Sequence, residues 1–307
     1  MARLFEPFPQ RSLILRNRIV VSPMCQYSAT DGVPDDWHLV HLGSRAVGGA
    51  AAIIAEATAI SPEGRITPGD TGIWNDEQAD AWARIARFIK AEGAVAGIQL
   101  AHAGRKASCA APWHGGKGLT PEEGGWTPLG PSAIPYDHHN PLPEALDEAG
   151  IANVVADFVA AARRALAAGF ELVEIHAAHG YLLHSFLSPL SNRREDRYGG
   201  SFDNRTRLLR DVLIEVRAVW PVHLPMWLRM SASDWAEGGW DIEDSVELAK
   251  VVSRLGVDLV DVSSGNLLPN HFAPSVPGYH VPFAARIRSE ARVATGAVGM
   301  ITEPEQA

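Results

Sequence analysis

Residues 147–180 have the sequence DEAGIANVVADFVAAARRALAAGFELVEIHAAHG, which holds one helical segment followed by one strand-like segment. Apolar residues recur at helical spacing through 147–168, and Gly169 is a stop signal, so the sequence predicts a helix over that range. Residues 172–180 begin as a continuous apolar run, which indicates a strand covered on both faces, and they end in polar residues. The stretch therefore predicts a helix packed against a buried strand whose carboxyl end is polar.

The same pattern recurs along the chain. Six further runs resemble the strand, at 18–24, 51–60, 95–104, 224–233, 259–265 and 293–301, which makes seven. Residues 203–219 and 242–255 have helical spacing, with Asp241 as the predicted N-cap of the second helix and Gly256 as the residue that follows it. Strands that alternate with helices favour βαβ units around a parallel sheet.

Polar residues gather at the carboxyl end of nearly every predicted strand. They are Cys25, residues 56–58, Gln99, His102, His176, His179, Arg229, Ser231, Ser263 and Ser264. In a (β/α)8 barrel these ends converge on one mouth, where active sites form. A doubly wound sheet is expected to carry a glycine-rich first turn, but no GxGxxG follows the first strand and no GxxxxGKS/T occurs. The sequence therefore predicts an α/β protein with a (β/α)8 TIM barrel, formed by a single domain over residues 1–307.

Residues 105–145 interrupt the alternation after the third predicted strand. The segment holds seven of the 21 prolines together with Trp113 and Trp126, and it shows little periodicity. A loop of this length in a compact domain is usually a lid or a binding segment. A disordered insertion is the weaker alternative, because the tryptophans favour burial. We expect a capping insertion at the active site.

The overall composition excludes several classes of partner. Lys and Arg number 27 against 36 Asp and Glu, a formal net charge of −9, so bulk charge gives no attraction to nucleic acid or anionic membranes. The longest apolar stretch, 46–60, contains Glu56 and is too short to span a bilayer, and no signal peptide is evident at the start. Two cysteines, Cys25 and Cys109, suit a reducing compartment. We expect a soluble, cytoplasmic protein.

His176 and His179 are the clearest candidates for chemistry, because both lie where a predicted strand ends. They could bind a metal ion, which would need a further carboxylate or histidine. They could instead donate hydrogen bonds to a developing oxyanion, with Tyr181, protonated at pH 7, as a proton donor. The third alternative is a pair of core histidines with satisfied hydrogen bonds.

Three more residues at the strand ends invite a functional interpretation. Cys25 by itself is most simply a small buried apolar residue, with a nucleophile or redox group as the alternative. Arg229 ends an apolar strand, so its charge must be neutralised, either by an ion pair with Glu56 or Glu174 or by an anionic cofactor ring. Gln99 offers one donor and one acceptor to an amide-like heterocycle.

Several longer segments resemble a known family. They are SPMCQYSA (22–29), EATAISPEGRITPGDTGIW (56–74), GIQLAHAGRKAS (97–108), GPSAIP (130–135), EIHAAHGYLLHSFLSPLSNRREDRYGGSFDNR (174–205) and ATGAVGMIT (294–302). These segments resemble the Old Yellow Enzyme family, and most closely its bacterial thermophilic-like class of FMN-dependent ene-reductases, also called NADPH dehydrogenases and xenobiotic reductases. The resemblance extends from about Leu4 to the last residue.

The resemblance implies a flavin-dependent oxidoreductase with FMN in the barrel mouth. NADPH or NADH would reduce the FMN, which would then transfer hydride to the β-carbon of an α,β-unsaturated carbonyl (an enone) or of a nitroalkene, with nitro compounds as further substrates. A homo-oligomer, dimer or tetramer, is also implied. No metal, nucleic acid or membrane partner is expected.

The resemblance also implies roles for individual residues around the cofactor. The cofactor-binding residues would be Ser22, Pro23, Met24, Cys25, Ala57, Gln99, Arg229, Ser263 and Gly299. Cys25 would lie near the reactive N5 edge of the flavin, and Arg229 would lie beside N1 and O2, where its charge stabilises the anionic reduced ring.

On the substrate side, the resemblance implies that His176 and His179 hold the carbonyl oxygen of the substrate. Tyr181 would deliver the proton to the α-carbon, and Tyr27 would contact the substrate. Together with Cys25, the two histidines and Tyr181 would form the catalytic set.

Two features depart from the family pattern. The family segment PGYQ has His280 in place of its glutamine, so no cofactor role is assigned to His280. The family's phosphate site includes a glycine and an arginine after an eighth strand, whereas seven strands are predicted here, so we expect the natural protein to be longer by roughly 50–60 residues. The alternatives are a metal-dependent barrel hydrolase that uses His176 and His179, and a non-catalytic or incomplete chain that folds poorly or binds flavin weakly.

Overall fold

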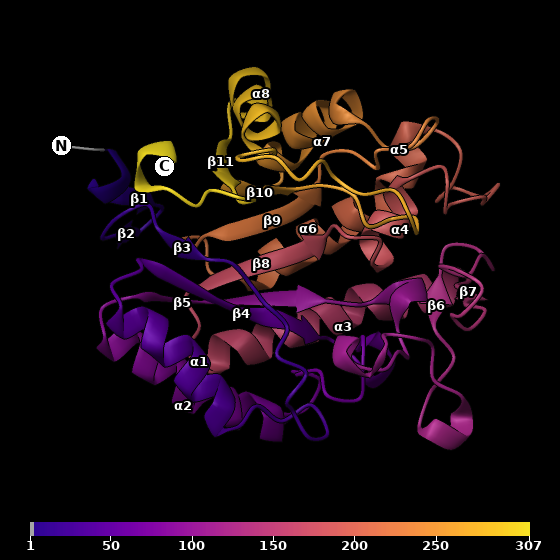
Figure 1. Cartoon of the computed structure of the whole chain (residues 1–307), viewed down its shortest axis with the longest axis horizontal. Helices are drawn as coiled ribbons and strands as arrows, with labels where there is room; N and C mark the ends of the chain where they lie inside the picture. Colours follow the sequence, from indigo (N-terminus) through magenta and orange to yellow (C-terminus); the bar gives the residue numbers. More distant parts are fainter. Residues whose placement is uncertain (1–2) are drawn as a thin grey trace.

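Seven parallel strands form one sheet in the computed structural model, which describes residues 3–307 (Figure 1). In the order in which they pair, the strands are β11 (Ala294–Ala297), β10 (Leu259–Ser263), β9 (Met226–Ser231), β8 (Leu172–Ala177), β5 (Val95–Ala101), β4 (Ala52–Ala59) and β3 (Val20–Val21). Each of the seven predicted runs contains one of them. Strands β4, β8, β9 and β10 are buried along their whole length, which explains their continuous apolar sequence.

The sheet is curled, although it does not close. Val20 of β3 and Ala297 of β11 stand at opposite ends of the strand order, yet they line the same cavity of about 180 Å³, together with Ile54 and Trp227 from strands between them. In the part of the chain that the structure describes, β3 and β11 form no ladder with each other. The predicted parallel α/β sheet of seven strands is thus confirmed. Residues 3–307 do not form a closed eight-stranded barrel, because the backbone groups along these two edges do not pair.

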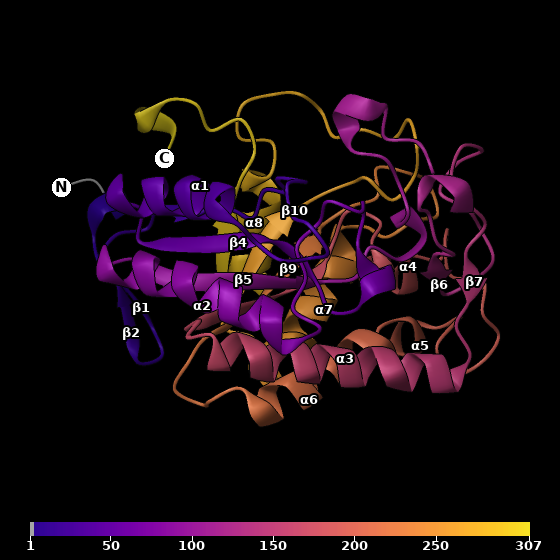
Figure 2. The ribbon, with the colours of Figure 1, turned by 90° about the horizontal axis from the view of Figure 1, so that it is seen from below.

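Helices cover the outer surface of the curled sheet (Figures 1 and 2). The long ones are α1 (Asp36–Val47), α2 (Asp76–Ala91), α3 (Glu148–Ala167), α6 (Arg207–Val219), α7 (Ile242–Arg254) and α8 (Val281–Ala291). Their apolar faces join one core cluster with the strands, in which Trp82 of α2 and Phe158 of α3 are fully buried. Among residues 3–307, no helix has the length and apolar character needed to cross a bilayer.

The predicted helix ends agree closely with the observed ones. Asp147 caps α3 by accepting a hydrogen bond from the backbone N–H of Gly150. Asp241 caps α7, and Gly169 and Gly256 take the left-handed conformation expected of the residue after a helix, with φ of +89° and +94°. The segment predicted as one helix over 203–219 is in fact two pieces, α5 (Phe202–Arg205) and α6, which are separated by Thr206.

An N-terminal hairpin that the sequence analysis does not predict covers the amino end of the sheet. Strands β1 (Phe8–Gln10) and β2 (Leu13–Leu15) pair antiparallel. Gln10 accepts a hydrogen bond from Trp227 Nε1 at 2.8 Å, and Leu15 packs into a cluster with residues at the strand starts, such as Leu172. With the amino end covered, the carboxyl ends of the strands form the end available for a site.

Residues 105–145 form an irregular excursion at the end of the molecule toward which β4 points (Figures 1 and 2). The segment contains short 3₁₀ turns and a small parallel pair, β6 (Leu129–Gly130) with β7 (Glu144–Ala145). Trp126 is half-buried and donates through Nε1 to the carbonyl oxygen of Glu63 at 2.9 Å. Trp113, by contrast, is 63% exposed, so the expected burial of both tryptophans is wrong for this residue.

Candidate functional site

The strand register brings three of the predicted site residues, Gln99, His176 and Arg229, onto adjacent strands. His176 on β8 is opposite Arg229 on β9, and Arg229 is opposite Asp261 on β10. On the other side of β8, Glu174 is opposite Gln99 of β5. Because all these strands are parallel, the side chains lie on adjacent strands near their carboxyl ends, as the sequence predicts.

The two histidines are in contact with each other. Strand β8 ends at Ala177, and His179 lies beyond it with φ of +60°, so the chain turns and both rings reach the same place. His176 Nε2 is 3.3 Å from His179 Nδ1. The backbone N–H of Ala178 donates to His176 Nδ1, which puts the ring proton of His176 on Nε2, facing His179. His179 Nε2 is 2.6 Å from the Ser263 hydroxyl oxygen.

Both imidazoles are neutral at pH 7. Burial lowers the pKa of His176 and of His179 well below the ordinary value, and the positive charge of Arg229 lowers both further. Each ring therefore carries one N–H that can donate a hydrogen bond, and neither can act as a protonated acid. This state suits the stabilisation of a developing oxyanion better than it suits proton transfer.

Tyr181 lies beside the histidines and holds a transferable proton. Its ring centroid is 4.8 Å from that of His176. Burial raises the pKa of Tyr181 well above its usual value, with smaller contributions from Cys25 and Tyr27, so the phenol is protonated throughout the physiological range. Its hydroxyl makes no hydrogen bond within residues 3–307, which leaves the proton free for a ligand.

Lys106 joins this group, although the sequence analysis assigns it no role. Its ammonium donates hydrogen bonds to the carbonyl oxygens of His179 at 3.0 Å and Asn266 at 3.1 Å, and it lies 5.6 Å from the centroid of the Tyr181 ring. Burial lowers the pKa of Lys106 to about 8, and the neighbouring charge of Arg105 acts in the same direction. Lys106 follows β5, so it ties the end of that strand to the turn after β8.

Cys25 and Tyr27 are held in place by Glu56, which the sequence analysis lists among the polar strand ends and as a candidate partner of Arg229. Strand β4 has a register shift between Ala55 and Ala57, so Glu56 leaves the ladder. Its Oε2 accepts a hydrogen bond from the backbone N–H of Gln26 at 2.8 Å, and its Oε1 is 3.3 Å from His38 Nε2. A β-bulge cannot be recognised from this sequence, which explains why the role of Glu56 was missed.

The Cys25 thiol is half-buried and protonated. Burial raises its pKa well above the ordinary value, and the charges of Asp70 and Glu56 raise it further, against opposing contributions from the Ala57 amide and the Tyr27 hydroxyl. The structure therefore brings Cys25, Tyr27 and Ala57 close together. An ionised nucleophilic cysteine is not favoured in this environment.

The buried cluster around Arg229 retains unpaired polar atoms. Arg229 Nη1 lies 3.3 Å from Asp261 Oδ2, so its ion-pair partner is neither Glu56 nor Glu174, the two suggested by the sequence. Gln99 donates to Glu174 Oε1 at 2.7 Å. Within the described residues, Arg229 Nε and Glu174 Oε2 are buried without a hydrogen-bond partner. A flavin ring, whose N1 and O2 edge accepts hydrogen bonds, fits the free guanidinium donor, so the residues present are compatible with FMN.

The remaining predicted cofactor residues are less closely grouped. Ser22 and Pro23 are half-buried, and Met24 is 45% exposed. Gly299 follows β11 with φ of +115° and packs beside Tyr279 and His280. His280, to which no cofactor role is assigned, is satisfied by Ser264 at Nε2 and by the carbonyl oxygen of Val298 at Nδ1.

No group of three or more histidine, cysteine or acidic side chains within residues 3–307 is arranged to hold a metal ion. His176 and His179 face each other, and their other ring nitrogens are within hydrogen-bonding distance of the Ala178 amide and the Ser263 hydroxyl. A hydrolase that uses these two histidines as metal ligands therefore lacks the further ligand that it needs.

Comparison with known proteins shows the family to which the chain belongs. The family model described as the NADH:flavin oxidoreductase / NADH oxidase family matches residues 3–307. An NADPH dehydrogenase from Listeria innocua serovar 6a is 48% identical over 309 residues, an alignment that covers 100% of this chain and 86% of the relative.

Two solved structures show the same architecture. The Old Yellow Enzyme homologue from Zymomonas mobilis is 31% identical with a TM-score of 0.78, and the match covers 95% of this chain and 81% of that one. Morphinone reductase is 30% identical with a TM-score of 0.78, and the match covers 95% of this chain and 78% of that one. A further structure of morphinone reductase is a complex with tetrahydroNAD.

Proposed function

Because the chain belongs to the NADH:flavin oxidoreductase / NADH oxidase family, which includes the Old Yellow Enzymes, we propose that it reduces the C=C bond of enones and nitroalkenes. The family and its NADPH dehydrogenase relatives make the chain an NAD(P)H-dependent FMN oxidoreductase. When bound, FMN supplies hydride transfer from NAD(P)H to the substrate. We therefore propose which compounds accept the hydride and which residues activate them.

The observation that carries the proposal is the contact between two neutral histidines beside a protonated tyrosine. His176 Nε2–H is a buried donor with no charge, 3.3 Å from His179 Nδ1. A carbonyl or nitro oxygen that approaches this pair accepts the hydrogen bond and becomes more electron-withdrawing, which activates the β-carbon toward hydride. Neutral donors polarise the substrate oxygen without forming a tight ion pair with the product.

Tyr181 completes the reduction in this proposal. Hydride addition at the β-carbon leaves negative charge on the substrate, and the α-carbon must take up a proton. The phenol of Tyr181 is protonated and its hydroxyl has no protein partner within residues 3–307, so the proton is available. Lys106, beside the Tyr181 ring, adds positive charge that favours loss of this proton.

On the cofactor side, we assign Arg229 and Gln99 to the polar edge of the flavin and Cys25 and Ala57 to its N5 edge. Arg229 brings a buried positive charge that favours an anionic reduced ring, while Asp261 partly offsets it. The protonated Cys25 thiol is a weak hydrogen-bond donor and carries no charge that would repel the ring. Ser22, Pro23, Met24, Ser263 and Gly299 remain proposed cofactor contacts.

Residues 105–145 are proposed to cap this site within the single domain. Trp113 of this segment meets Tyr27 edge-on, with ring centroids 5.6 Å apart, so the two rings form one wall for a flat substrate. We further propose nitro compounds as substrates, a homodimer or homotetramer, and a cytoplasmic location, which suits the two free thiols Cys25 and Cys109.

Turnover with a matched pair of small ketones tests the function. With the FMN-loaded protein and NADPH, 2-cyclohexenone should yield cyclohexanone, followed by NADPH absorbance and by product mass. Cyclohexanone itself, which has the same oxygen but no C=C bond, should not consume NADPH. Equal rates with the two ketones, or no product from the enone while NADPH is consumed, would contradict the proposal.

A further inference from the structure

The turn that carries His179 and Tyr181 is fixed at its central residue, Gly180, by two side chains of the next helix. The backbone N–H of Gly180 donates to His184 Nδ1 at 2.9 Å, and the carbonyl oxygen of Gly180 accepts from the Ser185 hydroxyl at 2.9 Å. Both side chains belong to the short helix α4 (Leu182–Leu187) and are buried. Both the N–H and the carbonyl oxygen of Gly180 are therefore hydrogen-bonded to side chains of α4.

This turn depends on such support, because its conformation is unusual. His179 and Gly180 are both left-handed, with φ of +60° and +76°. A Cβ on Gly180 would lie 2.5 Å from the carbonyl oxygen of Asn266, so the turn also packs tightly against the loop after β10. A residue other than glycine, such as His179, keeps a left-handed backbone conformation only where the surrounding structure holds it there.

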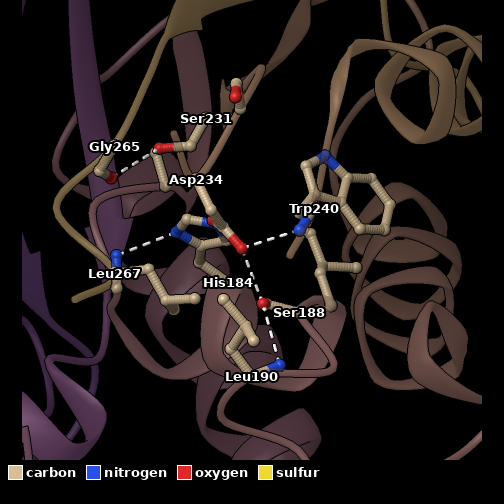
Figure 3. Close-up of polar contacts among 12 residues, drawn as sticks. His184, Ser188, Leu190, Ser231, Asp234, Trp240, Gly265 and Leu267 are labelled. Carbon is tan, nitrogen blue, oxygen red and sulfur yellow. Dashed lines mark hydrogen bonds and ion pairs between the residues drawn. The ribbon is translucent and has the colours of Figure 1, made fainter. Parts of the chain in front are cut away.

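His184 is in turn oriented by a buried carboxylate. Since His184 Nδ1 accepts the hydrogen bond from Gly180, the ring proton must be on Nε2, and Nε2 is 2.9 Å from Asp234 Oδ1. The other oxygen, Oδ2, accepts from the Ser188 hydroxyl at 2.6 Å and from the backbone N–H of Trp240 at 2.7 Å (Figure 3). His184, Ser188 and Asp234 are fully buried.

The carboxylate of Asp234 is ionised in this network. Burial acts to raise its pKa, but the interaction with His184 and the hydrogen bonds from Ser188 and Trp240 together hold the pKa below its usual value. The negative charge of Oδ1, in contact with His184 Nε2 at 2.9 Å without regular hydrogen-bond geometry, favours the ring proton on Nε2. Asp234 therefore fixes the tautomer in which His184 Nδ1 is free to accept the Gly180 N–H.

We propose that His184, Ser185 and Asp234 are positioning residues for the alkene-reduction step, acting through the Gly180 peptide to aim His179 and Tyr181 at the substrate. None of the three is placed to touch the substrate or the cofactor. The proposal rests on the proposed function, since it is the enone that His179 and Tyr181 would activate. Because Asp234 follows β9 and Tyr181 follows β8, the network also couples two neighbouring strand ends.

Asp234→Asn is the most specific test. The amide keeps the volume of the carboxyl group, but whichever way it is oriented its NH2 faces a donor, either His184 Nε2–H or the backbone N–H of Trp240. The orientation toward His184 forces the ring proton onto Nδ1, where it opposes the Gly180 N–H. Ser245→Ala is the matched control, because Ser245 is buried in the same region and accepts from Trp240 Nε1 at 2.7 Å without contacting the turn.

Two readouts separate positioning from general destabilisation. Hydrogen–deuterium exchange, measured by mass spectrometry on the peptide spanning 178–185 in the FMN-loaded protein, should be about tenfold faster in Asp234→Asn and unchanged in Ser245→Ala. On the proposed function, the oxyanion of 4-nitrophenol would accept hydrogen bonds from the histidine pair, so its dissociation constant should also rise about tenfold in Asp234→Asn alone. A fall in Tm in both variants with no difference in these two readouts would overturn the proposal.

Ser185→Ala keeps the test decisive where Asp234→Asn fails to fold, because it removes one hydrogen bond to the Gly180 carbonyl and leaves no buried charge. It should change both readouts in the same direction, and no change in either would overturn the proposal. The exchange measurement does not depend on catalysis. If the wild-type protein reduces no alkene but exchange still rises in the variants, the proposed function fails while the positioning of the turn stands.

Discussion

His176 Nε2 and His179 Nδ1 face each other at 3.3 Å, and both rings are kept neutral by burial and by the charge of Arg229. The pair therefore behaves as two neutral hydrogen-bond donors rather than as an acid, a base or a metal site. This arrangement determines how the stability and the chemistry of the protein should respond to pH and to substitution.

The first prediction concerns pH and stability. The folded-state pKa of His176 lies below its ordinary value of 6.5, so the unfolded chain binds a proton that the folded chain excludes as the pH falls through 6.5. The free energy of unfolding should therefore decrease below that pH, by at most about 1.4 kcal/mol per pH unit for this residue. Urea titrations at pH 7.5 and 5.5 should show that the free energy of unfolding decreases less in His176→Asn than in the wild type.

His223→Asn is the control for that experiment, because His223 is exposed and on the opposite side of the fold from the strand ends. The free energy of unfolding of His223→Asn should depend on pH as that of the wild type does. A decrease in His176→Asn as large as in the wild type would show that His176 is charged in the folded protein.

The second prediction concerns the proton donor. Tyr181→Phe removes the only hydroxyl of that side chain and should slow reoxidation of reduced FMN by 2-cyclohexenone about a hundredfold, while reduction of FMN by NADPH stays nearly unchanged. Stopped-flow absorbance separates the two steps. Tyr136→Phe, whose ring also lies near Lys106, is the control and should alter neither step. Equal losses in both steps of Tyr181→Phe would refute the assignment.

The third prediction concerns Cys25. Because burial and the charges of Asp70 and Glu56 raise its pKa, little thiolate is present at neutral pH. In a Cys109→Ala background, alkylation of Cys25 by iodoacetamide at pH 7.5 should be at least about tenfold slower than that of free cysteine, and should become fast after unfolding in urea. Mass spectrometry follows the labelling. A folded-state rate equal to that of free cysteine would indicate an activated thiolate instead.

The fourth prediction uses the Arg229–Asp261 pair, whose charges should shift the reduction potential of bound FMN in opposite directions. Arg229→Met removes the positive charge and should make the potential more negative, whereas Asp261→Asn removes the opposing negative charge and should make it more positive. Equilibrium redox titration with a reference dye measures both. Shifts of the same sign in the two variants would place the flavin edge away from this pair.

How far the sequence predicts this structure depends on the range of the interaction involved. Helix ends such as Asp241 and Gly256 were predicted correctly, because capping is set by residues within one turn. The seven strands were found because burial on both faces leaves a continuous apolar run. Their order and parallel register then brought the polar strand ends together as expected.

Contacts between residues far apart in the chain could not be predicted from the sequence. The partner of Arg229 is Asp261, a residue set opposite it by the register of β9 and β10, whereas Glu56 and Glu174 looked equally suitable in the sequence. The hairpin of β1 and β2 was missed because its strands have three residues each, too few for a period to appear. Asp234 was missed because its role depends entirely on its contact with His184.

An anaerobic absorbance titration of the FMN-loaded protein tests the central claim most directly. Addition of one equivalent of NADPH should bleach the flavin absorbance in the blue, and subsequent addition of 2-cyclohexenone should restore it while cyclohexanone is formed. Cyclohexanone added in place of the enone should leave the flavin reduced. Restoration of colour by cyclohexanone as well, or a reduced flavin that persists with the enone, would contradict the account.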